Sequence, residues 1–151
     1  MIFNWILINK LAIGTPIISE DNKKLIQKRG IRSILDLRNK DDLLLINHKK
    51  YVNNLSEFQY RNFGLPDHKS RRLAETDEIN KTLVLLKNLL KEGSVFMHCH
   101  AAIERSPLMS VAYLQFCKGL TPIQAYDFVK QQNKQTNISL KQLNKINLTE
   151  L

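Results

Sequence analysis

Apolar residues recur along the chain in two patterns, one typical of strands and one typical of helices. Short apolar or alternating runs, bounded by turn residues, predict buried strands. Gly14-Thr15-Pro16 ends the second of these runs, and Gly64-Leu65-Pro66-Asp67 follows the fourth. The predicted strands cover residues 6–8, 11–13, 31–37, 58–63 and 94–98.

Helical spacing of apolar residues fills the intervals between most of these strands. In the longest example, Ile79, Leu83, Leu86 and Leu90 fall on one face of a helix that ends near Gly93. Four more helices are expected, and residues 39–57 show no clear period. These helices run from Ser19 to Gly30, from the Arg105 region to Gly119, from Thr121 to about Gln132, and from Ser139 to Asn147.

Strands that alternate with helices predict an α/β fold. We expect a central, mostly parallel sheet of about four to five strands, flanked by helices. The 151 residues are enough for one domain, covering residues 1–151. An apolar fraction of 43% excludes disorder for most of the chain. No apolar stretch is long enough for a membrane span and no signal peptide is visible, so a cytoplasmic protein without membrane contact is expected.

The net charge of +9 favours anionic partners such as phosphates and acidic proteins. The chain has no basic run, so a nucleic-acid role would rest on net charge alone and is not predicted. Two cysteines are too few for a disulfide scaffold or a cysteine-based zinc site. The histidines lack metal-ligand spacing, and we expect neither a metal nor another cofactor.

Residues 95–107 carry the clearest chemical signal, because they read as a strand, a tight loop and a helix. Cys99 ends the strand and Arg105 starts the helix, with five residues between them. A loop that enters a helix N-terminus presents backbone N–H groups to an anion. Arg105 can add a two-pronged contact to a phosphate, and the positive field favours the thiolate form of Cys99. A thiolate beside a bound phosphate is a nucleophile for phosphoryl transfer.

The sequence His98-Cys99-x5-Arg105-Ser106 resembles the signature loop of the cysteine-dependent protein tyrosine phosphatase superfamily. The short chain is most similar to the dual-specificity branch, with looser likeness at residues 11–14 and 30–38. The resemblance implies that Cys99 attacks phosphorus and forms a phosphocysteine, while Arg105 binds the phosphate. It also implies that Ser106 stabilises the departing thiolate and that His98 orients the loop from behind. The remaining residues of the implied phosphate-binding loop are His100, Ala101, Ala102, Ile103 and Glu104.

The implied mechanism needs a carboxylic acid that protonates the leaving oxygen. Asp67 is our choice, because Leu65-Pro66-Asp67-His68 resembles the acid loop of the tyrosine-specific branch with Leu in place of Trp. Asp77 is the reserve candidate, although helix capping explains it. Three cationic residues after Asp67 would then lie at the mouth of the site and draw acidic or multiply phosphorylated substrates. They are Lys69, Arg71 and Arg72.

Two residues of the loop depart from the pattern. The family usually has glycine at the position of Ala102, where it eases the tight loop. Glu104 opposes anion binding unless it points outward, as alternating loop side chains would allow.

The main prediction is a phosphatase of phosphomonoesters, with phosphotyrosine or phosphoserine/threonine proteins as substrates. The departures at Ala102 and Glu104 keep open a catalytically weak phosphate-binding module. A rhodanese-like sulfurtransferase is a third reading, which Ser106 and the length of the following helix disfavour. The sequence leaves the phosphate-bearing substrate and the oligomeric state undetermined.

Overall fold

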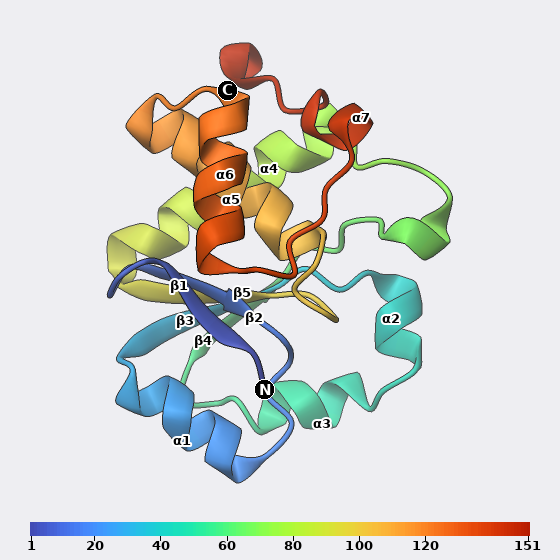
Figure 1. The fold of residues 1–151 in the computed structure, drawn as a ribbon. Helices are drawn as coiled ribbons and strands as arrows, with labels where there is room; N and C mark the ends of the chain where they lie inside the picture. The colour runs from blue at the N-terminus through green and yellow to red at the C-terminus, as the bar shows by residue number, and fades with distance from the viewer.

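The computed structural model describes residues 1–151, the side chain of Glu150 excepted. Its centre is a five-stranded sheet in the order β1-β2-β5-β3-β4 (Figure 1). Strand β1 pairs antiparallel with β2, and every other pair is parallel. The predicted α/β fold with a mostly parallel sheet is therefore confirmed. The strands are β1 (Phe3–Leu7), β2 (Leu11–Gly14), β3 (Ile31–Asp36), β4 (Gln59–Asn62) and β5 (Ser94–His98).

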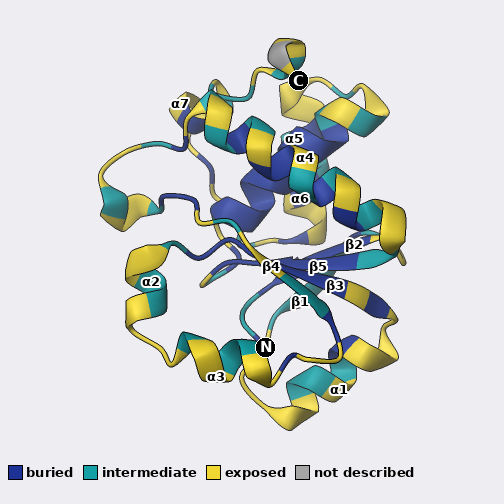
Figure 2. Ribbon diagram, turned by 180° about the vertical axis from the view of Figure 1, so that it is seen from behind, coloured by how far each residue is buried: buried dark blue, intermediate teal, exposed yellow. Residues whose placement is uncertain are grey.

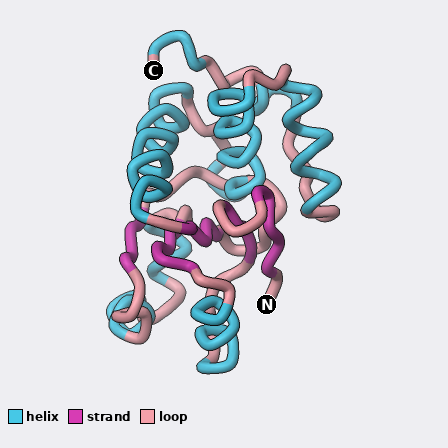
Figure 3. The backbone as a smooth tube through the Cα atoms, turned by 90° about the vertical axis from the view of Figure 1, so that its left-hand side faces the viewer, coloured by secondary structure: helices cyan, strands magenta, loops and turns pink.

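Helices cover both faces of this sheet, as the edge-on view in Figure 3 shows. Helices α1 (Glu20–Lys28) and α3 (His48–Asn53) lie on one face. The opposite face carries three longer helices, and the short helices α2 and α7 lie further from the sheet. The remaining helices are α2 (Lys40–Leu44), α4 (Thr76–Glu92), α5 (Arg105–Lys118), α6 (Pro122–Gln132) and α7 (Leu140–Leu143), with short 3-10 turns at His68–Ser70 and Leu148–Glu150.

Strand β5 separates the two hydrophobic cores of the fold. Successive side chains of a strand point to opposite faces of the sheet. Val95 and Met97 accordingly join the core beneath α4 and α5, while Phe96 joins the core beneath α1. All three side chains are fully buried, and Figure 2 shows the central strands and the first part of α5 as the most buried region. The centre of the sheet is thus a rigid base for the loop that follows β5.

Residues 39–57, which show no period in the sequence, form α2 and α3. Asn39 and Asn47 cap these helices by accepting hydrogen bonds from the backbone N–H groups of Asp42 and Lys50. Neither helix buries a residue fully, so neither leaves an apolar repeat in the sequence.

The predicted last helix, from Ser139 to Asn147, was too long. Helix α7 ends at Leu143, and the backbone N–H of the capping residue Asn144 bonds carbonyls within the helix. Two other predicted helices begin where expected, because the side chains of Ser19 and Thr121 cap them by accepting a bond from a backbone N–H of the first turn.

Candidate active site

The site lies where the parallel strands end. In open α/β sheets, loops at the carboxyl ends of the strands form the binding crevice. Strand β3 leads to Arg38 and Asp42, β4 leads to Asp67, and β5 leads to Cys99. These segments enclose a pocket of about 210 Å³. Its lining residues are Arg38, Asp42, Leu45, Ile46, Asp67, His68, Lys69, Cys99, His100, Ala101, Ile103, Glu104 and Arg105.

The loop between Cys99 and Arg105 is folded tightly at Ala102. This residue has φ 57°, in the left-handed region that favours glycine, and its side chain is fully buried. The loop is fixed from outside by two bonds to its carbonyl groups. Asn133 Nδ2 donates to the Ala102 carbonyl at 2.8 Å, and the Asn137 backbone N–H donates to the Ile103 carbonyl at 2.8 Å.

These outer bonds orient the loop amides. In a trans peptide unit the C=O and the following N–H point in opposite directions. Anchoring the Ala102 and Ile103 carbonyls outside therefore turns the N–H groups of Ile103 and Glu104 the other way. Among the described residues, the N–H groups of residues 100–104 donate to no other atom of the chain. The loop offers these donors to an anion at the N-terminus of α5.

Cys99 is the nucleophile candidate inside this loop. It is 2% exposed, and it is a free cysteine. Its Sγ lies 3.4 Å from the Oγ of the fully buried Ser106. Either the Ser106 hydroxyl or the Cys99 thiol can be the donor of this bond. The structure therefore brings together the two residues that the motif assigned to the sulfur chemistry.

Arg105 is held by a residue that the sequence reading missed. Its Nη1 donates to Asp42 Oδ2 at 2.6 Å, and the carbonyls of Leu37 and Leu65 lie 3.4 Å from the same nitrogen. The guanidinium is 4% exposed and the Asp42 side chain 16% exposed. Asp42 fixes one end of the guanidinium and leaves its Nη2 end on the side of Asp67. The only sequence signal for Asp42 was its place three residues after the capping residue Asn39.

Asp67 lies across the pocket from the loop. Its Oδ2 is 3.9 Å from Arg105 Nη2, and its Oδ1 accepts bonds from the Lys69 N–H at 3.0 Å and the Ser70 hydroxyl at 3.2 Å. Burial alone would raise the pKa of Asp67. The positive Arg105 and the bonds from Ser70 and Lys69 outweigh burial and hold the pKa below its ordinary value.

His98 lies behind the loop, fully buried. Its Nε2 is 3.0 Å from Tyr51 Oη, and its Nδ1 is 3.2 Å from the Cys99 carbonyl and 3.8 Å from Asp36 Oδ1. Burial lowers the pKa of His98 and outweighs the pull of Asp36 in the opposite direction. The ring is therefore neutral at pH 7 and ties the end of β5 to α3. Tyr51 carried no signal in the sequence.

Glu104 does not point away from the site, as the alternation of loop side chains had allowed. It precedes α5 as the N-cap residue without making a cap bond, and its half-buried side chain lines the pocket beside Asp67 and His68. Burial raises the pKa of Glu104, outweighing the opposite effects of His68 and Arg105.

The three cations after Asp67 divide between two places. Lys69 lines the Cys99 pocket, whereas Arg71 and Arg72 line a neighbouring hollow that also contacts Glu104. Arg72 donates to both carboxylate oxygens of Glu78, at 2.6 and 2.9 Å. Of the three, Lys69 alone lies beside Cys99 within the part of the chain that the structure describes.

The described residues contain neither a cluster of metal ligands nor a helix that could span a membrane. No three His, Cys, Asp or Glu side chains there gather as metal ligands would. No helix there is both long and apolar enough to cross a bilayer.

Residues 18–150 match the family of the dual specificity phosphatase catalytic domain. The chain belongs to this family. It is 30% identical over 119 residues to human dual specificity protein phosphatase 6, a match that covers 78% of this chain and 28% of that protein. It is 26% identical over 146 residues to bovine protein tyrosine phosphatase domain-containing protein 1, covering 84% of this chain and 17% of the relative. The chain thus spans less than a third of these relatives.

Solved structures of phosphatases share the fold of this dual-specificity phosphatase domain. PTPMT1 superposes with a TM-score of 0.76 at 16% identity, covering 95% of this chain and 90% of PTPMT1. The human tyrosine phosphatase-like serine/threonine/tyrosine-interacting protein gives a TM-score of 0.75 at 20% identity, with 95% and 91% coverage. The predicted resemblance to the dual-specificity branch is confirmed.

Proposed function

We propose that this chain is a cysteine-dependent phosphatase that hydrolyses phosphomonoesters of phosphoproteins through a phosphocysteine intermediate. One observation carries the proposal. Cys99 and Arg105 bracket a loop whose amide donors bond no other atom of the described residues and whose Ala102 and Ile103 carbonyls are anchored outside by Asn133 and Asn137. Such a loop binds the phosphate dianion and stabilises the charge that develops on its oxygens during transfer.

In the first step, the Cys99 thiolate attacks phosphorus. The S–P bond forms as the bond from phosphorus to the leaving oxygen breaks, and Asp67 delivers its proton to that oxygen. In the second step, a water attacks phosphorus and gives a proton back to Asp67. The S–P bond breaks and the electron pair returns to sulfur, where the Ser106 hydroxyl stabilises the thiolate.

The low pKa of Asp67 belongs to the protein without substrate. A phosphate dianion bound at the loop places negative charge beside both Asp67 and Arg105, whose Nη2 lies 3.9 Å from the carboxylate. This charge offsets the positive field that lowers the pKa, and it repels the ionised carboxylate directly. Substrate binding therefore raises the pKa of Asp67 toward the value that a proton donor needs.

Ala102 supports an active loop rather than a weakened one. At φ 57° it adopts the conformation for which glycine is usually chosen, so the substitution has not opened the loop. The short distance from Cys99 to Ser106 likewise favours phosphatase chemistry over sulfur transfer. The cytoplasmic location stays a prediction from the sequence.

Turnover of para-nitrophenyl phosphate in EDTA and reductant tests the proposal. Wild type, Cys99→Ser and Cys117→Ser should be compared, because Cys117 is the other cysteine and lies outside the pocket. We expect vanadate-sensitive turnover in wild type and Cys117→Ser and none in Cys99→Ser. Turnover that survives in Cys99→Ser, or wild-type turnover that requires a metal ion, would overturn the proposal.

A further inference from the structure

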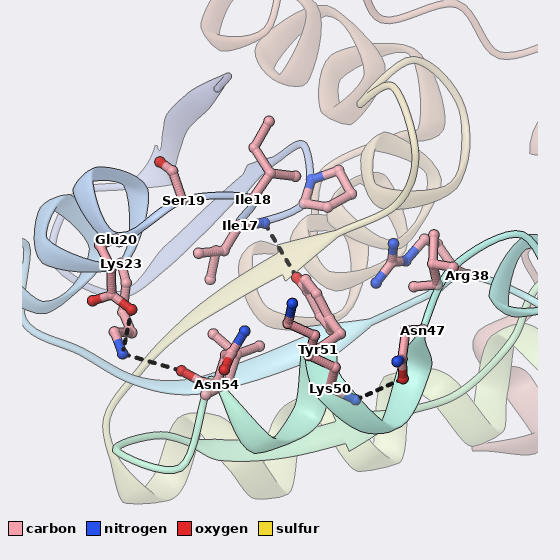
Figure 4. A pocket seen from close by; sticks show the side chains of 13 residues that line it. Ile17, Ile18, Ser19, Glu20, Lys23, Arg38, Asn47, Lys50, Tyr51 and Asn54 are labelled. Carbon is pink, nitrogen blue, oxygen red and sulfur yellow. Dashed lines mark hydrogen bonds and ion pairs between the residues drawn. The ribbon is translucent and has the colours of Figure 1, made fainter.

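A second cavity, of about 430 Å³, adjoins the Cys99 pocket. Figure 4 shows its two walls, the segment from Pro16 to Lys23 on one side and α3 on the other. Two hydrogen bonds join these walls. The Ile17 N–H donates to Tyr51 Oη at 3.2 Å, and Lys23 Nζ donates to the Asn54 carbonyl at 3.2 Å. Because bonds between distant segments hold the walls together, the cavity is preformed, as ligand sites usually are.

The lining combines apolar walls with a few polar groups. Ile17, Ile18 and Leu55 supply apolar surface, and Leu55 is 2% exposed. Asn47 and Asn54 are exposed and line the cavity with their amides. A cavity of this size, mostly apolar with a few placed polar groups, is typical of a site that holds part of a ligand.

The cavity lies next to the Cys99 pocket and shares two lining residues with it. Arg38 and Ile46 line both. Arg38 is a fixed divider, because Asp36 accepts two bonds from its guanidinium, at 2.9 and 3.0 Å, and the guanidinium lies 4.6 Å from the centre of the Tyr51 ring. Ile46 is 38% exposed and forms an apolar ridge between the two hollows. A ligand group in one hollow can therefore be connected across Ile46 to a group in the other.

The charged side chains that line the cavity indicate which kind of ligand would fit it. Lys23 is paired with Glu20 at 3.2 Å and Glu57 at 3.4 Å. Lys50 also lines the cavity, and among the described residues no carboxylate lies within ion-pair distance of its ammonium group. An apolar hollow beside an unpaired ammonium fits an apolar side chain flanked by an acidic residue.

We propose that this cavity is a substrate subsite for a large apolar side chain of a phosphoprotein, close in sequence to the phosphorylated residue, with Lys50 pairing an acidic residue beside it. The subsite rests on the proposed function, since it positions the same phosphate over Cys99. An extended chain advances about 3.3–3.6 Å per residue, so neighbouring hollows are reached by residues a few positions apart. The side-chain amide of Asn54 and the Nδ2 group of Asn47, whose Oδ1 already caps α3, can bond the peptide groups of such a chain, which the acyl chains of a lipid cannot do.

Phosphotyrosine peptides with one leucine moved through the sequence test the subsite. The leucine is placed at each position within about three residues of the phosphotyrosine, in an otherwise alanine and serine background. The readout is kcat/KM for phosphate release, expressed relative to the peptide without leucine. We expect one position to raise kcat/KM by about tenfold, the discrimination that apolar pockets provide. Glutamate placed next to that leucine should raise kcat/KM further.

Two variants, each with a matched control, test whether the leucine and glutamate preferences arise in this cavity. Asn54→Trp fills the cavity, while Asn53→Trp adds the same side chain at an exposed neighbouring position outside it. Lys50→Glu reverses the charge in the cavity, and Lys49→Glu reverses an exposed charge that does not line it. The leucine preference should vanish in Asn54→Trp and persist in Asn53→Trp. The glutamate preference should vanish in Lys50→Glu and persist in Lys49→Glu.

The outcomes distinguish a failure of the subsite proposal from a failure of the proposed phosphatase activity. Wild-type turnover of para-nitrophenyl phosphate reports the Cys99 chemistry alone. If it proceeds while no leucine position is preferred, the subsite is wrong and the proposed function stands. An equal leucine preference in Asn54→Trp and Asn53→Trp also overturns the subsite. Faster hydrolysis of phosphoinositide in anionic vesicles than of every peptide would assign the cavity to a lipid and refute the phosphoprotein proposal.

Discussion

Replacing Asp42 by asparagine tests the contact that fixes Arg105. The substitution keeps the shape of the side chain and an oxygen that can still accept a bond, but it removes the negative charge. Hydrogen bonds to charged groups stabilise a fold by about 1.5–3 kcal/mol, and a neutral bond by about 1 kcal/mol. Because the guanidinium is 4% exposed and Asp42 is 16% exposed, solvent screens the pair only in part. We expect Asp42→Asn to lower the free energy of unfolding by about 1–2 kcal/mol.

Asp41→Asn is the matched control. Asp41 stands beside Asp42 in the first turn of α2 and is exposed, so both variants remove one favourable charge from the N-terminus of that helix. That contribution is about 0.3–1 kcal/mol. Subtracting the effect of Asp41→Asn therefore leaves the bonds that Asp42 Oδ2 accepts from Arg105 and from the Asn39 backbone N–H. The remaining difference is about 1 kcal/mol, and with a urea dependence of about 1–3 kcal/mol per molar it moves the unfolding midpoint by about 0.3–1 M.

Asp42→Asn and Asp41→Asn should also differ in their phosphatase activity. Without the Asp42 charge, the guanidinium no longer has one end fixed, and the positioning of its phosphate-binding end is lost. We expect kcat/KM for para-nitrophenyl phosphate to fall about tenfold in Asp42→Asn, equivalent to about 1.4 kcal/mol, and to stay unchanged in Asp41→Asn. Equal unfolding midpoints for the two variants, or full activity in Asp42→Asn, would refute the reasoning.

Three further predictions concern the surroundings of the pocket. Asp67→Asn should lower kcat on alkyl phosphates by about 10²–10⁴-fold and abolish the alkaline limb of the pH–kcat profile, while Asp77→Asn changes neither. Because the pKa of Glu104 is raised, its side chain becomes negatively charged at a higher pH than an ordinary glutamate. That charge repels the phosphate, so the KM of wild type should rise as Glu104 ionises, and Glu104→Gln should flatten the rise. Steady-state kinetics over about pH 5–8 would show both effects. A KM profile unchanged by Glu104→Gln would place this carboxylate away from the phosphate. Tyr51→Phe leaves the buried His98 ring without one partner and should lower the free energy of unfolding by about 1–3 kcal/mol in urea; an unchanged midpoint would show that the contact contributes nothing.

The sequence predicts most of this fold because its strands and long helices each bury an apolar stripe. The loop from Cys99 to Arg105 can also be predicted from the sequence, since its function depends on residues that are close together in the chain. The residues that hold the loop in place cannot be predicted in this way. Asp42 reaches Arg105 across 63 positions, Tyr51 reaches His98 across 47, and Asn133 reaches Ala102 across 31. Such contacts are made by tertiary packing and leave no periodic signal.

These distant contacts explain how the loop tolerates alanine at its tightest point. The left-handed conformation costs a residue other than glycine about 1–2 kcal/mol. Burying the Ala102 methyl group returns about 0.8 kcal/mol of that cost. The loop geometry is therefore held from outside the loop. It depends on Asn133, which bonds the Ala102 carbonyl, Thr136 and Asn4 at once and is itself fully buried. Anchored in this way, the loop keeps its amide donors turned toward the pocket without a glycine at its tightest point.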